Sequence, residues 1–144
     1  MSGSPERILD LDLAADLDGL RAGLTAIERH CGAVGLPAAV IARILAVFEE
    51  IFTNTVKYGY RGQHGMRIHA FLSGSGPAQL TVEDSAPPFD PTTWNAAPDL
   101  AGDLSTRPVG RVGIALVMGL ARNVRWQPLA PGNRLTLEFS VEGV

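Results

Sequence analysis

The sequence is poor in features that mark several large classes of protein. Its one cysteine, Cys31, cannot form a disulfide within the chain, so a reducing cytoplasm is the expected setting. The three histidines, His30, His64 and His69, lack metal-ligand spacing, which argues against a structural zinc site. No apolar run approaches the ~18 residues of a membrane span. The first residues have neither a basic nor an apolar region, so we expect no secretory signal.

Positive charge is also scarce. Twelve Lys and Arg residues stand against 15 Asp and Glu residues, which gives a net charge of −3 and no basic footprint for nucleic acid. The 144 residues suffice for one domain with its own core. We therefore expect a single domain over residues 1–144, with a flexible tail at 1–6, that contacts neither nucleic acid nor membrane directly.

A long amphipathic helix is the most regular feature of the chain. From Pro37 onward, apolar residues recur at the i, i+3, i+4, i+7 spacing of one buried helix face. Glu50, Asn54 and Lys57 project together on a different face. On the residues alone, this second face is either solvated and ion-paired in the ordinary way, or a site that sets a carboxylate one turn before a carboxamide.

The remaining pattern predicts the element order β-α-α-β-β-lid-α-β-β. Asp16 is expected to cap a helix that runs to about residue 31, and a third helix is expected over 114–121. Apolar and polar residues alternate in the five expected strands, at 7–13, 66–72, 78–82, 123–127 and 134–141. Helices would then cover one face of a mainly antiparallel mixed sheet, which is a two-layer α+β sandwich.

Residues 50–54 (EIFTN) and 56–60 (VKYGY) resemble the N box of the GHKL ATPases, which include gyrase, Hsp90, histidine kinases and MutL. They are most similar to the small anti-sigma factor serine kinases of the RsbW and SpoIIAB type. The resemblance implies that the side-chain oxygen of Asn54 holds Mg²⁺ and that Glu50 acts as general base or orients the attacking group. Lys57 stands at the basic position of this motif and is expected beside the nucleotide.

Residues 82–91 (VEDSAPPFDP) carry an acid into a proline-rich turn. Aspartate is a good turn residue in any fold, but the segment also resembles the G1 box in the Pro-Phe-Asp-Pro variant of the anti-sigma kinases. The resemblance implies that Asp84 accepts a hydrogen bond from the exocyclic amine of adenine, with Ala86 and Phe89 beside the base. ATP would be chosen over GTP because guanine has a carbonyl there. Ala86 replaces the usual glycine, so its Cβ is expected to crowd the base or forbid a positive φ.

Residues 109–117 (VGRVGIALV) resemble the G2 box. Glycines at a helix start let backbone N–H groups approach phosphate oxygens, although a glycine before a helix is common in any fold. Gly110, Arg111, Val112 and Gly113 are therefore expected at the phosphates, and Arg111 either reaches a phosphate or points to water. The irregular residues 92–109 correspond to the family's ATP lid.

Together the three boxes imply an ATP- and Mg²⁺-dependent protein serine/threonine kinase that acts as an anti-sigma factor. Its substrate would be a serine on a STAS-domain anti-sigma factor antagonist, its other partner a sigma factor, and its own state a homodimer. The sequence shows no histidine-bearing helix pair of a sensor kinase and no transducer domain of the gyrase or MutL kind. Two alternatives stay open: a catalytically inactive, ATP-responsive protein-binding module, and an α+β scaffold without a ligand.

Overall fold

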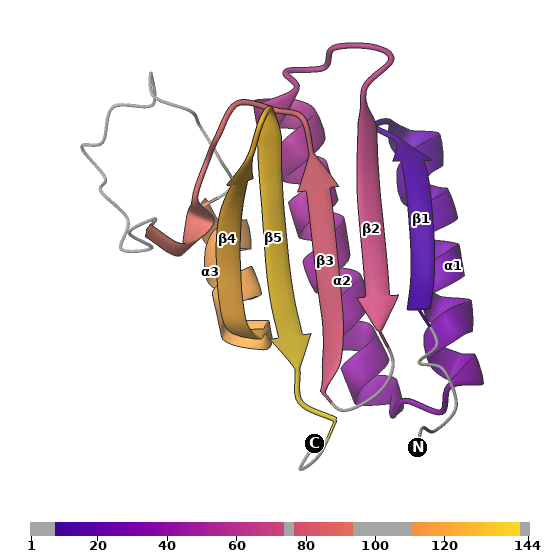
Figure 1. Ribbon diagram of the computed structural model, residues 1–144. Coiled ribbons are helices and arrows are strands. Elements are labelled where there is room, and N and C mark those ends of the chain that lie inside the picture. Colours follow the sequence, from indigo (N-terminus) through magenta and orange to yellow (C-terminus); the bar gives the residue numbers. More distant parts are fainter. Residues whose placement is uncertain (1–7, 74–76, 94–110, 142–144) are drawn as a thin grey trace, which may run out of the picture.

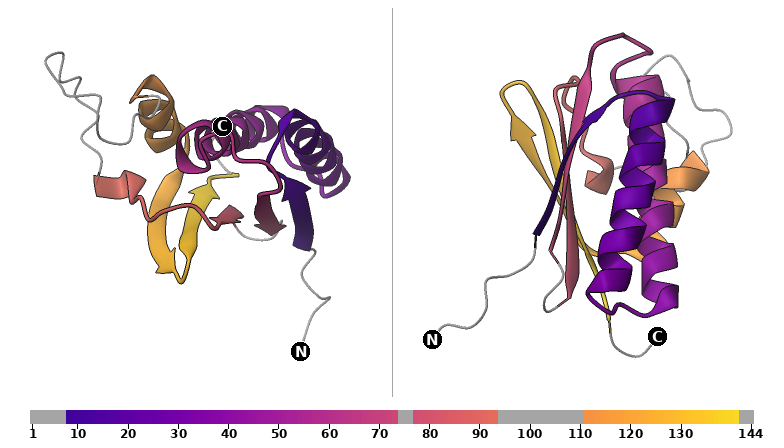
Figure 2. Two further views of the ribbon diagram at one scale, coloured as in Figure 1. Left: turned by 90° about the horizontal axis from the view of Figure 1, so that it is seen from above. Right: turned by 90° about the vertical axis from the view of Figure 1, so that its right-hand side faces the viewer.

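The computed structural model describes residues 8–73, 77–93 and 111–141, which form a two-layer α+β sandwich (Figure 1). The sheet has the strand order β1-β2-β3-β5-β4, and the helices cover one of its faces (Figure 2). The expected fold class is confirmed. Every described strand pair is antiparallel, so this part of the sheet is not mixed as we expected. The elements are β1 (Ile8–Ala14), α1 (Leu17–Ala33), α2 (Ala38–Asn54), β2 (Arg67–Ser73), β3 (Ala78–Asp84), α3 (Arg111–Leu120), β4 (Arg122–Leu129) and β5 (Gly132–Phe139).

The helix starts follow local sequence chemistry. Asp16 caps α1 as expected, because its Oδ1 accepts a hydrogen bond of 2.8 Å from the backbone N–H of Gly19. Pro37 precedes α2 as its N-cap, in an extended conformation. A helix with the length and apolarity needed to traverse a bilayer is absent from the described residues.

The core lies between the helices and the sheet, and α2 occupies its centre, between α1 and α3 (Figure 1). Phe48 and Phe52 of α2 are fully buried there, with their rings 5.6 Å apart. Gly23 of α1 allows close helix packing, since a Cβ at this position would lie 2.7 Å from the Phe48 ring. The apolar helix face predicted from the sequence is therefore the face that holds the two layers together.

The opposite face of the sheet is polar, which explains why no described helix covers it (Figure 2). Arg67 pairs with Asp12 across β2 and β1 at 3.0 Å, and Arg134 pairs with Glu83 across β5 and β3 at 2.6 Å. Because side chains alternate along each strand, the apolar ones lie on the sheet face that packs against the helices and the charged ones lie on the face exposed to solvent.

The end of α2 departs from the predicted regular helix. Residues Thr55–Gly59 form a π-helical turn, closed by a 2.7 Å hydrogen bond from the N–H of Tyr60 to the carbonyl of Thr55. Such turns are rare and occur often at functional sites. The turn begins directly after Asn54, the predicted carboxamide ligand, so it sets the direction in which the backbone leaves α2.

Candidate functional site

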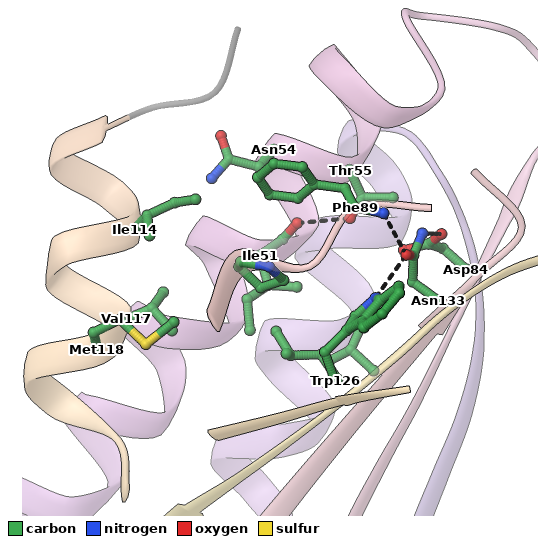
Figure 3. A pocket seen from close by; sticks show the side chains of 13 residues that line it. Ile51, Asn54, Thr55, Asp84, Phe89, Ile114, Val117, Met118, Trp126 and Asn133 are labelled. Carbon is green, nitrogen blue, oxygen red and sulfur yellow. Dashed lines mark hydrogen bonds between the residues drawn. The ribbon is translucent and has the colours of Figure 1, made fainter. Parts of the chain in front are cut away.

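A pocket opens between α2, α3 and the adjoining ends of β3 and β5 (Figure 3). Its empty volume, counted with the open solvent at its mouth, is about 610 Å³. Its walls are mainly apolar, with a few polar groups to orient a ligand. They are formed by Ile51, Asn54, Thr55, Val82, Asp84, Phe89, Pro91, Ile114, Val117, Met118, Trp126, Asn133 and Leu135.

At one end of the pocket, the helix end, Asn54 lies on the wall, and Glu50 and Gly113 lie beside it without lining the pocket. Asn54 is the last residue of α2 and its Nδ2 donates a 3.2 Å hydrogen bond to Oε2 of Glu50, one turn earlier. The Glu50 carboxylate also lies against the first turn of α3, because a Cβ on Gly113 would be 2.1 Å from the same oxygen. From the sequence, Gly113 is predicted to let backbone N–H groups approach the phosphate oxygens of a nucleotide. The structure adds a steric reason for a glycine there.

The helix end offers an oxygen ligand of the kind that Mg²⁺ prefers. Since Nδ2 of Asn54 faces Glu50, the carboxamide oxygen lies on the other side of the group. The described residues hold no cluster of three His, Cys, Asp or Glu side chains suited to a metal. Mg²⁺ commonly uses few protein ligands together with substrate phosphates and water, so Asn54 fits a metal that arrives with a nucleotide.

The other end, the sheet end, is built around Asp84 and Asn133, which lie opposite each other in the β3–β5 register. Oδ1 of Asp84 accepts two hydrogen bonds of 2.9 Å, one from the backbone N–H of Ala86 and one from Nδ2 of Asn133. The carboxylate is therefore held in one orientation by the protein before any ligand is present.

Ala86 does not cause the difficulty that its sequence position suggested. Its side chain is 1% exposed and packs in the core, and it does not line the pocket. Its φ is not positive, unlike that of Arg61 or Asn123. The expectation that a Cβ here would forbid the backbone conformation is therefore wrong, and the crowding of a base stays a prediction. The contribution of Ala86 in this structure is its N–H to Asp84.

Asn133 is the site residue that the sequence analysis missed. It is 6% exposed. Its Nδ2 also donates to the carbonyls of residues 86–87 at 3.3 and 3.2 Å. Its Oδ1 accepts from the N–H of Phe89 and from Nε1 of Trp126, both at 2.8 Å (Figure 3). One buried carboxamide thus ties the loop after β3 to β4 and β5. Its one signal in the sequence is that a polar residue stands directly before the alternating strand predicted at 134–141.

Tyr60 holds the same loop from the opposite direction. Its hydroxyl donates to the carbonyl of Arg67 at 2.6 Å and accepts from the N–H of Ser85 at 2.8 Å. Burial raises the pKa of Tyr60 above its usual value, the Ser85 N–H lowers it, and the negative charge of Asp84 raises it again. The hydroxyl therefore keeps its proton, and with it the bond to Arg67, at neutral pH.

The remaining predicted residues fall into three groups. Phe89 lines the pocket with Asn54 and Asp84, so parts of separate motifs meet at one place. Lys57 is exposed on the π-turn and is not on the wall. Residues 94–110, which include Gly110 and most of the expected lid, lie outside the described residues, as do the side chains of Arg111 and Val112. The roles of all these residues in nucleotide binding stay predictions.

The comparisons with known proteins agree with this architecture. Residues 13–139 match the family model for the histidine kinase-like ATPase domain, and the chain belongs to this family, within the GHKL superfamily.

Among solved structures, the chain is similar to the RsbU and RsbW domains of Rv1364c from Mycobacterium tuberculosis, with a TM-score of 0.63 and 21% identity. The match covers 96% of this chain but 33% of that protein, so this chain spans about a third of its length. At this identity the likeness shows the fold alone. No protein with a curated description matches.

Proposed function

We propose that this chain is an ATP-dependent protein serine/threonine kinase that acts as an anti-sigma factor. The observation that carries the proposal is the convergence of Asn54 and Asp84, from separate motifs, on one largely apolar pocket of a histidine kinase-like ATPase domain. Its substrate would be a STAS-domain anti-sigma factor antagonist, and it would sequester a sigma factor, as a homodimer in the cytoplasm. The fold shared with a protein described by RsbU and RsbW domains supports this regulatory setting.

ATP would lie with its base at the sheet end and its phosphates at the helix end. Asp84 would accept a hydrogen bond from the adenine amine, and the apolar wall around Phe89 would exclude water from the base. Asn54 would hold Mg²⁺, which supplies positive charge to the phosphates when bound. The start of α3, with Gly110, Arg111, Val112 and Gly113, would receive the phosphates, and residues 92–109 would form the lid.

The transfer step needs little more than positioning and electrostatics. The acceptor hydroxyl oxygen forms a bond to the γ-phosphorus, the bond from that phosphorus to the β-phosphate oxygen breaks, and ADP leaves. Glu50 takes the proton of the acceptor hydroxyl. Its position one turn from Asn54, with a 3.2 Å bond between them, supports this assignment because both groups would serve the same phosphate.

Calorimetric titration with ATP and with GTP, each with Mg²⁺, tests the nucleotide site. We expect binding of ATP in preference to GTP, and weaker ATP binding by Asn54→Ala and Asp84→Asn. Phosphate transfer to purified STAS-domain proteins then tests the kinase. Absence of ATP binding by the unaltered chain would overturn the proposal, and binding without transfer to any STAS-domain protein would remove the kinase assignment.

A second candidate is a catalytically inactive module that binds a regulator and responds to ATP. It is favoured by the position of Glu50, whose carboxylate is held by Asn54, lies against Gly113 and is not on the pocket wall. The Glu50→Gln variant separates the two candidates. A kinase should lose phosphate transfer and keep partner binding, whereas the inactive module should behave as the unaltered chain does.

A further inference from the structure

The π-turn at the end of α2 places a buried side chain beneath the loop that follows β3. A regular α-helix closes each turn with an i to i−4 bond, whereas here the N–H of Tyr60 bonds to the carbonyl of Thr55, five residues earlier. The extra residue in the turn changes the direction in which Tyr60 leaves the helix. Its side chain reaches the sheet and is 5% exposed there.

The Tyr60 hydroxyl connects three segments that are distant in the sequence. It belongs to the turn after α2, donates to the carbonyl of Arg67 at the start of β2, and accepts from the N–H of Ser85 after β3. Both bonds are short, at 2.6 and 2.8 Å. A buried hydroxyl with both of its roles filled fixes its partners, because breaking a buried hydrogen bond costs free energy.

The Ser85 N–H matters because it belongs to the peptide group that follows Asp84. A bond to this N–H fixes the plane of that peptide and therefore the backbone orientation of Asp84. The carbonyl of the same peptide group lies against Gly132, where a Cβ would be 1.9 Å away. Together with the bonds from Ala86 and Asn133 to Oδ1, these contacts hold both the backbone and the side chain of Asp84.

We propose that Tyr60 is a positioning residue for base selection: its hydroxyl sets the orientation of Asp84 and thereby the preference for a purine with an exocyclic amine. The proposal rests on the proposed role of Asp84 in contacting adenine. It also links the two ends of the pocket, because the turn that carries Tyr60 starts directly after Asn54. The carboxamide at the helix end and the carboxylate at the sheet end are thus joined through one turn and one hydroxyl.

The test compares ATP with ITP, in which a carbonyl replaces the exocyclic amine, in calorimetric titrations with Mg²⁺. The variants are Tyr60→Phe, which removes both hydroxyl bonds, and Tyr58→Phe as a matched control. Tyr58 lies on the same turn, and no hydrogen bond of its hydroxyl is present among the described residues. We expect Tyr60→Phe to reduce the ratio of ATP to ITP affinity by about tenfold, the usual effect of one misplaced polar contact, and Tyr58→Phe to leave it unchanged.

The outcomes separate this proposal from the proposed function. If the unaltered chain binds ATP and ITP equally, Asp84 does not select the base, and the present proposal fails together with the proposed contact between Asp84 and adenine. The kinase assignment is then still decided by ATP binding and phosphate transfer. If the unaltered chain is selective and Tyr60→Phe keeps the full ratio, while its melting temperature falls, Tyr60 is merely structural and the present proposal is overturned.

A second variant covers the case in which Tyr60→Phe does not fold. Tyr60→p-aminophenylalanine keeps a donor for the carbonyl of Arg67, but its nitrogen is a poor acceptor for the Ser85 N–H. It therefore weakens the contact beside Asp84 and leaves the other in place. We expect a reduced ATP to ITP ratio with a nearly unchanged melting temperature, and an unchanged ratio would overturn the proposal.

Discussion

The two ends of the pocket are built in different ways. At the sheet end, the carboxamide of Asn133 makes five hydrogen bonds, and Asp84 and the loop after it are held from both sides. At the helix end, the one bond described between the predicted catalytic groups is that from Asn54 to Glu50, at 3.2 Å. The position of Glu50 depends there on steric contact with Gly113.

This difference suits two different tasks. A group that recognises a base must not move, and a buried network with every polar atom satisfied provides that rigidity. Groups that take part in phosphate transfer must exchange one partner for another during the reaction. The hydrogen bond between Asn54 and Glu50, with a net value of about 1 kcal/mol, is easily exchanged. The contrast predicts that damage to the sheet end costs stability, while damage to the helix end costs activity.

The largest effect is expected from Asn133→Ala. The change removes the buried acceptor of the N–H of Phe89 and of the indole N–H of Trp126, and it removes one of the two donors to Oδ1 of Asp84, which keeps the N–H of Ala86. Each such loss costs about 1–3 kcal/mol, so we expect a fall of about 3 kcal/mol or more in the free energy of unfolding, measured by urea denaturation. Gln127→Ala, on the exposed part of β4, is the control and should stay within about 0.5 kcal/mol. Similar losses in both variants would contradict the rigid sheet end.

The second effect concerns the helix end. Gly113→Ala places a Cβ where the Glu50 carboxylate lies, so Glu50 or α3 must move. We expect a loss of about 1–3 kcal/mol in stability and a larger relative loss of phosphate transfer. Gly119→Ala is a matched control on the same helix, because nothing lies within 4 Å of its Cβ. It should be neutral or stabilising by up to about 1 kcal/mol.

A double variant sharpens this test. Glu50→Ala removes the carboxylate that Gly113→Ala would meet, so the two changes together should destabilise the fold less than the sum of the single changes. Additive effects would show that Gly113 does not contact Glu50 in solution. The helix end would then lack the steric definition described above.

The layers of this fold were predictable because each element carries its own pattern. The apolar face of α2, the Asp16 cap and the alternation in β2 and β5 depend on neighbours in sequence, and the structure confirms them. The convergence of Asn54 and Asp84 came from a resemblance to known motifs and not from periodicity.

The missed features depend on contacts between distant segments. Asn133 matters because β3 pairs with β5, and alternation within each strand does not say which strands will be neighbours. Tyr60 reaches Ser85 because one residue is added in a π-turn, which a 3.6-residue period does not reveal. Glu50 lies against Gly113 because α2 packs beside α3, and no local pattern records that.

A variant outside both ends of the pocket tests whether base selection follows overall stability. Asp16→Ala removes the 2.8 Å N-cap bond of α1 and should cost about 1 kcal/mol, measured by urea denaturation. The affinities for ATP and GTP should keep their ratio. A changed ratio would show that base selection follows overall stability, and the claim of a separately held sheet end would fail.

The smallest effect is a pH dependence at the sheet end. Burial raises the pKa of Tyr60 in the folded chain, so above the ordinary tyrosine pKa of about 10 the unfolded chain loses a proton that the folded chain keeps. The folded state then binds more protons, and stability falls as pH rises. The contribution of Tyr60 is fully present below pH 10 and is lost as pH rises through its folded pKa.

Cys31 would obscure this pH dependence. Burial raises the pKa of its thiol to about 11, so Cys31 also lowers the free energy of unfolding as pH rises between about 9 and 11. Unfolding is therefore measured in a Cys31→Ala background. There, Tyr60→Phe should flatten the remaining alkaline slope, while Tyr58→Phe should leave it unchanged. If the unfolding free energy still falls with pH in the Tyr60→Phe variant, the Tyr60 hydroxyl is not the group whose proton the folded chain retains. The rigid network would then have to be explained by Asn133 alone.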